Sequence, residues 1–459
     1  MRIAFINANL SGDFSAADIA LTVLATQVNE RSRHSASICD LTFHRQNWQE
    51  HLRRYVLAAR PDAFGLSLNN LHLSYAEVVA RYLHQNHPGV PIIAGGHEAS
   101  VMENRPDWID CLVRGDGEEV LPELLDHLNR LPPEICQPFR SDLDTLGVPD
   151  WTLWADLRSY FYFLGGMLYV LGSRGCPHRC SFCTAPEIQR KVEGSYFRQR
   201  DPVSFVKELA VQEHRHTVDG LRFFQIFDPV FTIDADWVDT FCACYRTQCH
   251  LPFSVFARLD QLDERRVKAL ARAGCKIIRV GIEHGDERIR NEVLEKNVSD
   301  TQVKEAVALC HQAGINLTGY YILGVPGETH RTIRKTISLS RELACARSVF
   351  FVYKPFTKAG LAQVARFGGH VIGGVQPDNI TFGVAIQPSP HLSAKQVEWY
   401  QRWAYLLTFG PRWVKTVRRD GWRYFWELGW YVARGLRRGL SLRYLFTYFQ
   451  VYAGRNVYE

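Results

Sequence analysis

The chain has 459 residues, of which 46% are hydrophobic and 22% are charged, and its net charge is +6. This length allows two or three domains with buried cores, and the composition excludes a wholly disordered protein. A net charge of +6 is small for such a chain, and no dense basic stripe with interleaved aromatic residues occurs before the C-terminal region. A nucleic-acid-binding protein is therefore not indicated.

The N-terminus, MRIAFINAN, alternates like a β-strand and lacks the basic leader and small-residue cleavage site of a signal peptide. We therefore expect a cytoplasmic protein. In that compartment the twelve cysteines are expected to be thiols or metal ligands rather than disulfides.

The first 130 residues alternate short apolar runs with amphipathic stretches. The predicted strands are 2–8, 35–41, 62–68, 91–96 and 111–114, and the helical patterns between them include 17–30, 74–85 and 118–128. This order predicts a doubly wound parallel sheet. The loops after its strands contain GLSLNN, GGHE and GDGEE, whose glycines let the backbone approach a ligand closely. Gly95, Gly96 and Gly115 are thus candidate cofactor-binding residues.

Residues 131–166 break this pattern. Four prolines, Pro132, Pro133, Pro138 and Pro149, interrupt any long helix in the segment. We expect it to be a linker between two domains.

Three cysteines follow the linker at close spacing. Cys176, Cys180 and Cys183 lie in GSRGCPHRCSFC, and the next cysteine is Cys242. Closed zinc and iron–sulfur sites take four protein ligands, so a group of three suggests a metal centre with one position left open. The apolar run 168–173 before the loop predicts a buried strand, which places the cysteines at the carboxyl edge of a sheet. A zinc knuckle that borrows His178 is the alternative, although zinc-binding pairs are not usually spaced this way.

The CxxxCxxC spacing, with Phe182 just before the last cysteine, resembles the signature of the radical S-adenosylmethionine (SAM) superfamily. The resemblance implies that the three thiolates hold three irons of a 4Fe-4S cluster and that SAM chelates the fourth iron. One electron then cleaves SAM to a 5'-deoxyadenosyl radical, which abstracts hydrogen from a substrate. Because only one cluster motif is evident, an external electron donor is implied, such as a flavodoxin, a ferredoxin or a dedicated reductase.

Residues 167–360 contain six more predicted strands. These are 168–172, 221–227, 253–257, 277–283, 316–323 and 348–353, with helical patterns at 202–213, 236–247, 263–274, 301–314 and 329–343. Six units are too few for an eightfold barrel. They match the partial (βα)6 barrel of the radical SAM fold.

Residues at the ends of these strands are the candidates for the active site. By the resemblance, the segment with Asp228 lies near the methionine amine of SAM, and Glu283 lies near its ribose or amine. Phe182 and the turn that begins at Gly324 lie near its adenine. We add Arg258 as a cofactor-binding candidate, and a helix cap or a surface ion pair is the alternative for Asp228 and Arg258. Asp228 and the tyrosines Tyr320 and Tyr321 could carry a proton of the substrate.

Residues 1–130 resemble the cobalamin-binding domain that precedes many radical SAM cores, with GGHE and GDGEE at the usual places. The DxHxxG loop, which supplies a histidine ligand to cobalt in other corrinoid proteins, is missing. The resemblance therefore permits a cobalamin without a protein ligand, or an empty domain that serves as a scaffold. His72 and His97 are alternative ligands.

Residues 361–459 are rich in tryptophan and arginine and are expected to be mostly helical. No apolar stretch approaches the roughly 20 residues that cross a bilayer. We favour a cap that closes the barrel and buries the aromatic rings over a basic amphipathic surface that lies on a membrane.

Three functional hypotheses follow. The first is a cobalamin-dependent radical SAM methyltransferase acting on a small molecule, such as a secondary metabolite. The second is a cobalamin-independent radical dehydratase or deoxygenase of a sugar diol, as in aminoglycoside biosynthesis. The third is a metal-binding or redox-sensing protein without catalytic activity, which would bind metal without cleaving SAM.

Overall fold

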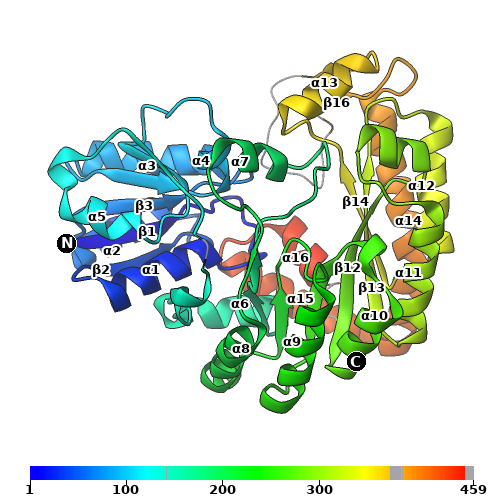
Figure 1. Cartoon of the computed structure of the whole chain (residues 1–459), viewed down its shortest axis with the longest axis horizontal. Helices are drawn as coiled ribbons and strands as arrows, with labels where there is room; N and C mark the ends of the chain where they lie inside the picture. Colours follow the sequence, from blue (N-terminus) through cyan, green and yellow to red (C-terminus); the bar gives the residue numbers. More distant parts are fainter. Residues whose placement is uncertain (141, 373–383, 385, 450–459) are drawn as a thin grey trace.

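The computed structural model describes residues 1–140, 142–372, 384 and 386–449. Two parallel six-stranded sheets lie side by side, the first formed by the N-terminal part of the chain and the second by its middle (Figure 1). The doubly wound sheet and the six-stranded partial barrel predicted from the sequence are both confirmed.

The N-terminal sheet has the strand order β2-β1-β3-β4-β5-β6. Its strands are β1 Arg2–Asn7, β2 Ser35–Asp40, β3 Ala63–Ser67, β4 Ile92–Gly95, β5 Cys111–Gly115 and β6 Glu134–Gln137. Its helices are α1 Ile19–Arg31, α2 Trp48–Ala59, α3 Leu73–Asn86, α4 His97–Val101 and α5 Val120–Asp126. Of these, α2 and the short α4 were not predicted.

Both faces of this sheet are covered because its central strands are apolar on both sides. Ile3 and Phe5 of β1 belong to the core formed with α1 and α5, whereas Ala4 and Ile6 belong to the core formed with α2 and α3. Successive side chains of a strand point to opposite faces. A strand with no polar alternation therefore needs helices on both sides, as parallel sheets generally do.

The segment predicted to be a linker contains strand β6, which the sequence analysis did not predict. Residues 134–137 pair in parallel with β5, with Leu112 opposite Glu134. Proline cannot donate to a ladder, yet Pro132, Pro133 and Pro138 flank the paired residues instead of interrupting them. The rest of the segment contains α6 Leu157–Phe163. There the Tyr160 hydroxyl donates to Asp40 Oδ2 at 2.9 Å.

The second sheet has the strand order β14-β13-β12-β11-β10-β7. Its strands are β7 Met167–Val170, β10 Phe223–Ile226, β11 Phe253–Ala257, β12 Cys275–Glu283, β13 Asn316–Leu323 and β14 Arg347–Val352. The helices α8 Pro202–His216, α9 Ala235–Gln248, α10 Glu264–Arg272, α11 Asp300–Gln312 and α12 His330–Glu342 line its outer side (Figure 1). The shorter elements are β8 Ser173–Arg174, α7 Ala185–Lys191, β9 Arg198–Gln199, α13 Lys358–Arg366, β15 His370–Val371 and β16 Ile386–Gln387.

Three further helices follow: α14 Ala394–Asp420, α15 Trp422–Arg437 and α16 Leu442–Tyr448. Helix α14 packs on β14, where the Gln401 amide donates to the Phe350 carbonyl at 2.7 Å. The helical prediction is therefore correct. The prediction that the aromatic rings are buried is wrong for a group of exposed tryptophans: Trp399, Trp413, Trp422, Trp426 and Trp430. Residues 373–383, 385 and 450–459 of the predicted C-terminal region lie outside the described residues.

Candidate active site

The carboxyl ends of the two sheets open onto one cavity of about 570 Å³. The N-terminal sheet contributes the side chains Asn69, Asn70, His97 and Glu98, which follow β3 and β4. The cysteine loop and the strand ends β11–β14 form the remainder, including Cys176, His178, Cys180, Phe182, Cys183, Arg258, Arg279, Glu283, Lys296, Tyr320, Phe351 and Tyr353. In open α/β sheets, ligands bind outside the carboxyl ends of the strands. This cavity is therefore the candidate active site.

All three predicted cysteine ligands line the cavity. They lie in the loop between β8 and α7, where the Cys183 N–H donates to the Cys180 carbonyl at 3.2 Å. The Ala185 N–H donates to Cys183 Sγ at 3.5 Å. Burial raises the pKa of Cys183 to about 11 and also raises that of Cys176. Because thiolates bind metals, these thiols must release protons when iron is bound.

The thiols are not arranged around one point. Within the described residues, no three His, Cys, Asp or Glu side chains come close enough to hold a single metal ion. A tetrahedral zinc ion needs all its ligands within about 2.3 Å of the metal. In an iron–sulfur cluster each thiolate binds a different iron, so the three thiols of this loop need not converge on one metal ion.

Glu283 ends β12 and reaches the cavity through an unusual backbone. Its φ is +63°, and the pairing of β12 with β13 shifts register between Gly281 and Glu283. Bulges of this kind re-aim side chains, and a non-glycine residue at positive φ is strained. Glu283 Oε1 accepts a hydrogen bond of 2.6 Å from Lys296 Nζ. A Cβ at Gly281 would lie 2.1 Å from Glu283 Oε1 and 2.6 Å from Lys296 Nζ, so a larger residue there would displace this pair.

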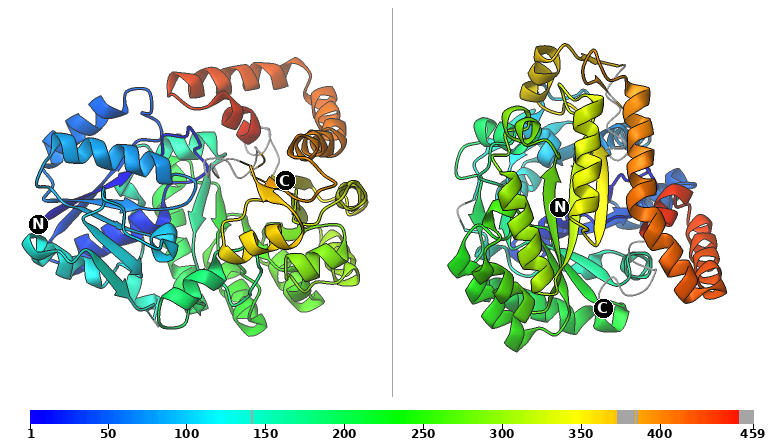
Figure 2. Two further views of the ribbon diagram at one scale, coloured as in Figure 1. Left: turned by 90° about the horizontal axis from the view of Figure 1, so that it is seen from above. Right: turned by 90° about the vertical axis from the view of Figure 1, so that its right-hand side faces the viewer.

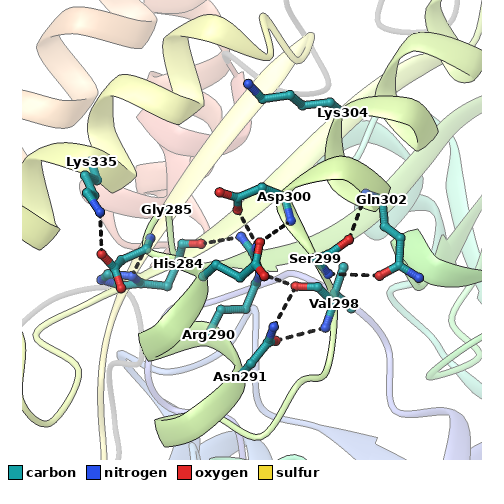
Figure 3. A network of polar contacts seen from close by, with 12 residues as sticks. His284, Gly285, Arg290, Asn291, Val298, Ser299, Asp300, Gln302, Lys304 and Lys335 are labelled. Carbon is teal, nitrogen blue, oxygen red and sulfur yellow. Dashed lines mark hydrogen bonds and ion pairs between the residues drawn. The ribbon is translucent and has the colours of Figure 1, made fainter.

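Lys296 is a cavity residue that sequence reasoning missed. It follows the π-helical turn Ile289–Val293 and stands between Glu295 and Asn297, which both have positive φ, at +53° and +56°. The only signal in the sequence was a single lysine in a polar loop, and most such lysines are solvated. Its position is fixed by Arg290, whose carbonyl accepts from the Lys296 N–H at 3.1 Å. Figure 3 shows the polar network around Arg290.

Arg258 lies directly on the cysteine loop. Its Nη1 donates to Cys180 Sγ at 3.6 Å, and its Nη2 donates to the Lys296 carbonyl at 2.7 Å. The same guanidinium forms an ion pair of 3.0 Å with Asp260. The alternative given for Arg258 was a surface ion pair, but in its ion pair with Asp260 the Arg258 side chain is buried and places a cation beside the thiols. Burial, the larger effect, raises the pKa of Cys176, and the positive charge of Arg258 acts in the opposite direction.

An aromatic row crosses the inner side of the second sheet. Tyr320 stacks on Phe351 with ring centroids 5.7 Å apart and an interplanar angle of 4°, and on Phe256 at 6.1 Å. Phe227 continues the row by an edge contact of 5.3 Å with Phe256. The Tyr320 hydroxyl accepts from Arg279 at 3.3 Å. Tyr321 is fully buried against Phe350 and does not line the cavity among the described residues.

Two of the glycines predicted to bind a cofactor, Gly96 and Gly115, lie where neighbouring backbone leaves no room for a side chain. A Cβ at Gly96 would lie 2.8 Å from the Leu68 carbonyl oxygen, and one at Gly115 would lie 1.9 Å from that of Gln137. Gly95 ends β4, and the side chains that reach the cavity from its loop are His97 and Glu98. His72 is not among the described cavity residues.

Gly324 lies in a turn that is fixed by hydrogen bonds to buried side chains outside the cavity. Its N–H donates to Glu328 Oε2 at 2.5 Å, and Glu328 Oε1 contacts His284 Nε2 at 2.8 Å. Glu328 and His284 are both fully buried. Gly324 itself is not among the described residues that line the cavity.

Asp228 is placed behind the cavity wall. It is completely buried, and its carboxylate accepts hydrogen bonds of 2.7 Å from the Gly172 N–H and the Ser173 hydroxyl. It therefore ties the end of β10 to the end of β7. This arrangement favours a structural role over the catalytic role predicted from the sequence.

Replacing Asp228 with asparagine distinguishes the two roles. Burial raises the pKa of Asp228 from 3.8 to about 6. The folded state therefore binds the proton of Asp228 more tightly than the unfolded state does. The protonated acid contributes fully to stability below about pH 4, and this contribution is lost as the pH rises through about 6. We expect Asp228→Asn to keep SAM cleavage. The free energy of unfolding of the parent chain should fall by on the order of 2–3 kcal/mol between about pH 4 and pH 6 because of Asp228, and this fall should be missing in the variant.

The measurement is the difference in thermal unfolding midpoint between Asp228→Asn and the parent chain from about pH 4 to pH 7. Cluster content serves as the control. Loss of SAM cleavage with a full cluster would instead assign Asp228 to the chemistry.

Two family models match the chain. Residues 170–340 match the radical SAM superfamily, and residues 6–125 match the B12 binding domain. The chain is therefore a radical SAM enzyme with an N-terminal B12-binding domain, which excludes the hypothesis of a protein without catalytic activity. These domains imply a 4Fe-4S cluster, SAM and cobalamin as cofactors.

The chain is similar to several known proteins over most of its length. It is 23% identical to an uncharacterized methyltransferase of Pyrococcus horikoshii, over 93% of this chain and 94% of that protein. It is 23% identical to the anaerobic magnesium-protoporphyrin IX monomethyl ester cyclase of Rubrivivax gelatinosus, over 69% and 60% of the two chains. The fold matches that of the radical SAM methyltransferase TsrM from Kitasatospora setae, solved with cobalamin and a [4Fe-4S] cluster. The TM-score is 0.67 at 20% identity, over 87% of each chain.

The residues present fit these groups. The three thiols line the cavity, and the Arg258 guanidinium donates to one of them, Cys180; a cluster requires such thiolates. The Glu283–Lys296 pair offers charged groups to the amino-acid part of SAM. The open carboxyl edge of the N-terminal sheet faces the same space, which is where a doubly wound sheet holds a large cofactor.

Proposed function

We propose that the protein is a cobalamin-dependent radical SAM methyltransferase that modifies a small molecule, with hydrogen abstraction from a substrate carbon by a deoxyadenosyl radical. The observation that carries the proposal is the single cavity shared by the cysteine loop and the edge of the B12-binding domain. Methyl transfer needs the cobalt and the SAM site to face the same substrate. A common cavity meets that requirement.

When bound, the cluster supplies the electron that cleaves SAM, and cobalamin carries the methyl group. Cys176, Cys180 and Cys183 hold the cluster, and Arg258 keeps positive charge beside them. Glu283 binds the ribose or the amino group of SAM, with Lys296 fixing its carboxylate. Phe182 packs by the adenine, and the turn at Gly324 shapes that end of the pocket.

The substrate is expected to have a flat or apolar face. The stacked rings of Phe256, Tyr320 and Phe351 form a continuous wall of the cavity. Such rings bind other ring systems by offset stacking. Tyr320 is the candidate for carrying a substrate proton, since it lines the cavity and its hydroxyl accepts a hydrogen bond from Arg279.

The B12-binding domain favours methyl transfer over dehydration or deoxygenation of a sugar diol. The loops with Gly95, Gly96 and Gly115 would hold the corrinoid. The chain would then divide into a B12-binding domain (1–130), a linker (131–166), a radical SAM barrel (167–360) and a C-terminal region (361–459). A relative named as a methyltransferase supports this choice. The electron is proposed to come from a flavodoxin, a ferredoxin or a dedicated reductase.

The test is an anaerobic assay of the reconstituted enzyme with SAM and a reductant, with and without cobalamin. We expect stoichiometric binding of cobalamin, and both S-adenosylhomocysteine and 5'-deoxyadenosine as products when cobalamin is present. Undiminished 5'-deoxyadenosine formation by a chain that binds no cobalamin would favour the dehydratase or deoxygenase.

Replacing Glu283 with glutamine should weaken SAM binding. A hydrogen bond to a charged group contributes about 1.5–3 kcal/mol, so the Kd for SAM should rise roughly 10- to 100-fold. Calorimetric titration of the cluster-loaded enzyme measures this change. Glu292→Gln is the matched control, because the Glu292 side chain is 65% exposed. An unchanged Kd for Glu283→Gln would remove Glu283 from the SAM site.

A further inference from the structure

The C-terminal helices carry most of the exposed hydrophobic surface of the protein. In the described residues, twenty large hydrophobic side chains are exposed, and twelve of them lie on α14, α15 and α16. These helices follow one another at one side of the molecule, where α15 and α16 form the outermost layer (Figure 2). Surfaces of this kind mark interaction sites.

Helix α15 has two apolar faces. Its inner face packs on the protein, where the Tyr431 hydroxyl donates to the Phe163 carbonyl at 2.7 Å and Gly435 lies against Leu445. Its outer face has no such contacts in the described structure and carries Trp422, Trp426 and Trp430, which are 89%, 76% and 60% exposed.

The outer residues form one continuous arc. At about 100° per residue, residues 422, 425, 426, 430 and 436 fall within an arc of about 140°. They are Trp422, Phe425, Trp426, Trp430 and Leu436, which we call the tryptophan face. Leu442 and Phe446 of α16 are exposed as well. A helix needs only one apolar face to pack on its own protein, so the second face requires a different partner.

The charge of this region is strongly positive. Residues 394–448 contain eleven Lys and Arg but three Asp and Glu, an excess of eight positive charges, whereas the whole chain has a net charge of +6. On α15 the exposed Arg437 falls within the tryptophan face, and Arg423 and Arg434 lie along one flank of it. Arg423 forms an ion pair of 3.1 Å with Glu427, and Arg434 lies 4.0 Å over the Tyr162 ring. The partner of this surface is therefore expected to be anionic.

The surface of an anionic membrane would match both the exposed aromatic side chains and the positive charge of this region. Tryptophan is enriched at the membrane–water interface, and basic amphipathic helices lie in that plane. A second copy of the chain would bring like charges together, which is unfavourable. The phosphates of a nucleic acid could pair with the arginines, but a nucleic acid offers no apolar surface to Leu436 and Leu442. No helix in the described part of the chain is long and apolar enough to cross a bilayer, so contact would be in the plane of the surface.

We propose that the tryptophan face of α15 docks the enzyme on the surface of a bilayer that contains anionic phospholipids. The tryptophan rings enter the headgroup region, and Arg423 and Arg437 bind lipid phosphates. This inference is independent of the reaction that the enzyme catalyses.

The test is flotation of the full chain with vesicles of phosphatidylcholine alone or mixed with phosphatidylglycerol. We expect binding to the mixed vesicles that weakens with added salt. The combined variant Trp422→Ser, Trp426→Ser, Trp430→Ser should bind at least about tenfold more weakly. Arg423→Gln with Arg437→Gln should lower binding to the mixed vesicles and flatten its salt dependence.

The matched control replaces three exposed hydrophobic residues elsewhere, Leu57, Val78 and Val218, with serine. This control should bind vesicles like the parent chain, and all variants should keep the parent unfolding midpoint. Failure of the parent chain to bind mixed vesicles, or undiminished binding by the tryptophan variant, would overturn the proposal. A concentration-dependent dimer that the tryptophan variant abolishes, without vesicle binding, would assign the face to a second copy and also overturn it.

Discussion

Replacing Cys180 with alanine is expected to abolish cluster assembly and SAM cleavage. Cys180 is 8% exposed and lies between the other two cysteines, with Arg258 donating to its sulfur. Two remaining thiols leave two irons without a protein ligand. Iron content after anaerobic reconstitution should fall from about four per chain to near zero, and the visible absorption of the cluster should disappear.

The control for this experiment is Cys244→Ala. Cys244 is a half-buried free cysteine on α9, and it does not line the cavity. This variant should keep its iron and its activity. If Cys180→Ala retained a full cluster, a different set of ligands would have to hold it, and the assignment of the site would be wrong.

Replacing Arg290 with methionine is expected to cause the largest loss of stability. The side chain is completely buried, and it donates to the Val298 carbonyl at 2.8 Å and to the His284 carbonyl at 2.9 Å. It also bonds Asp300 at 2.5 Å (Figure 3). Removing the guanidinium takes its donor from the buried His284 carbonyl and leaves the Val298 carbonyl with Asn291 alone, which costs about 3–5 kcal/mol. The unfolding midpoint of the radical SAM domain should fall by roughly 6–15 °C.

Arg290→Met should also weaken SAM binding, because the network holds the loop that carries Lys296. Glu295 and Asn297 have positive φ, and such strain persists only where the surroundings enforce it. Arg288→Met is the matched control, since the Arg288 side chain is 60% exposed and its nearest carboxylate is 3.8 Å away. Its midpoint should change little. An unchanged midpoint and an unchanged Kd for SAM in Arg290→Met would show that the network is dispensable.

Ion pairs between the two domains are a second feature that could not be predicted from the sequence. Asp116 of the GDGEE loop contacts Arg174 and Arg198, and Glu118 bonds Arg174 at 2.6 Å. The sequence suggested that this loop serves a ligand. The structure shows that its acidic side chains bind arginines that flank the cysteine loop, and this contact helps to align the two sheet edges.

The sequence determined the elements and the cluster motif. Apolar runs predicted the strands of both sheets in their order along the chain, except β6, because a parallel sheet buries both faces and leaves a strong local pattern. The cysteine spacing was equally local: three thiols within eight residues lie on one loop whatever the rest of the chain does. These features depend on neighbours in the sequence, so one chain sufficed to predict them.

Only the tertiary structure decided which side chains share the cavity. Lys296 bonds Glu283 across thirteen positions of the sequence, and His97 of the first domain lines the same cavity as the cysteines of the second. It also decided that Asp228 lies behind the wall and that the tryptophans of α15 face outward. The direction of a side chain depends on how whole elements pack, and on strained backbone such as that of Glu283. A local pattern carries no record of either.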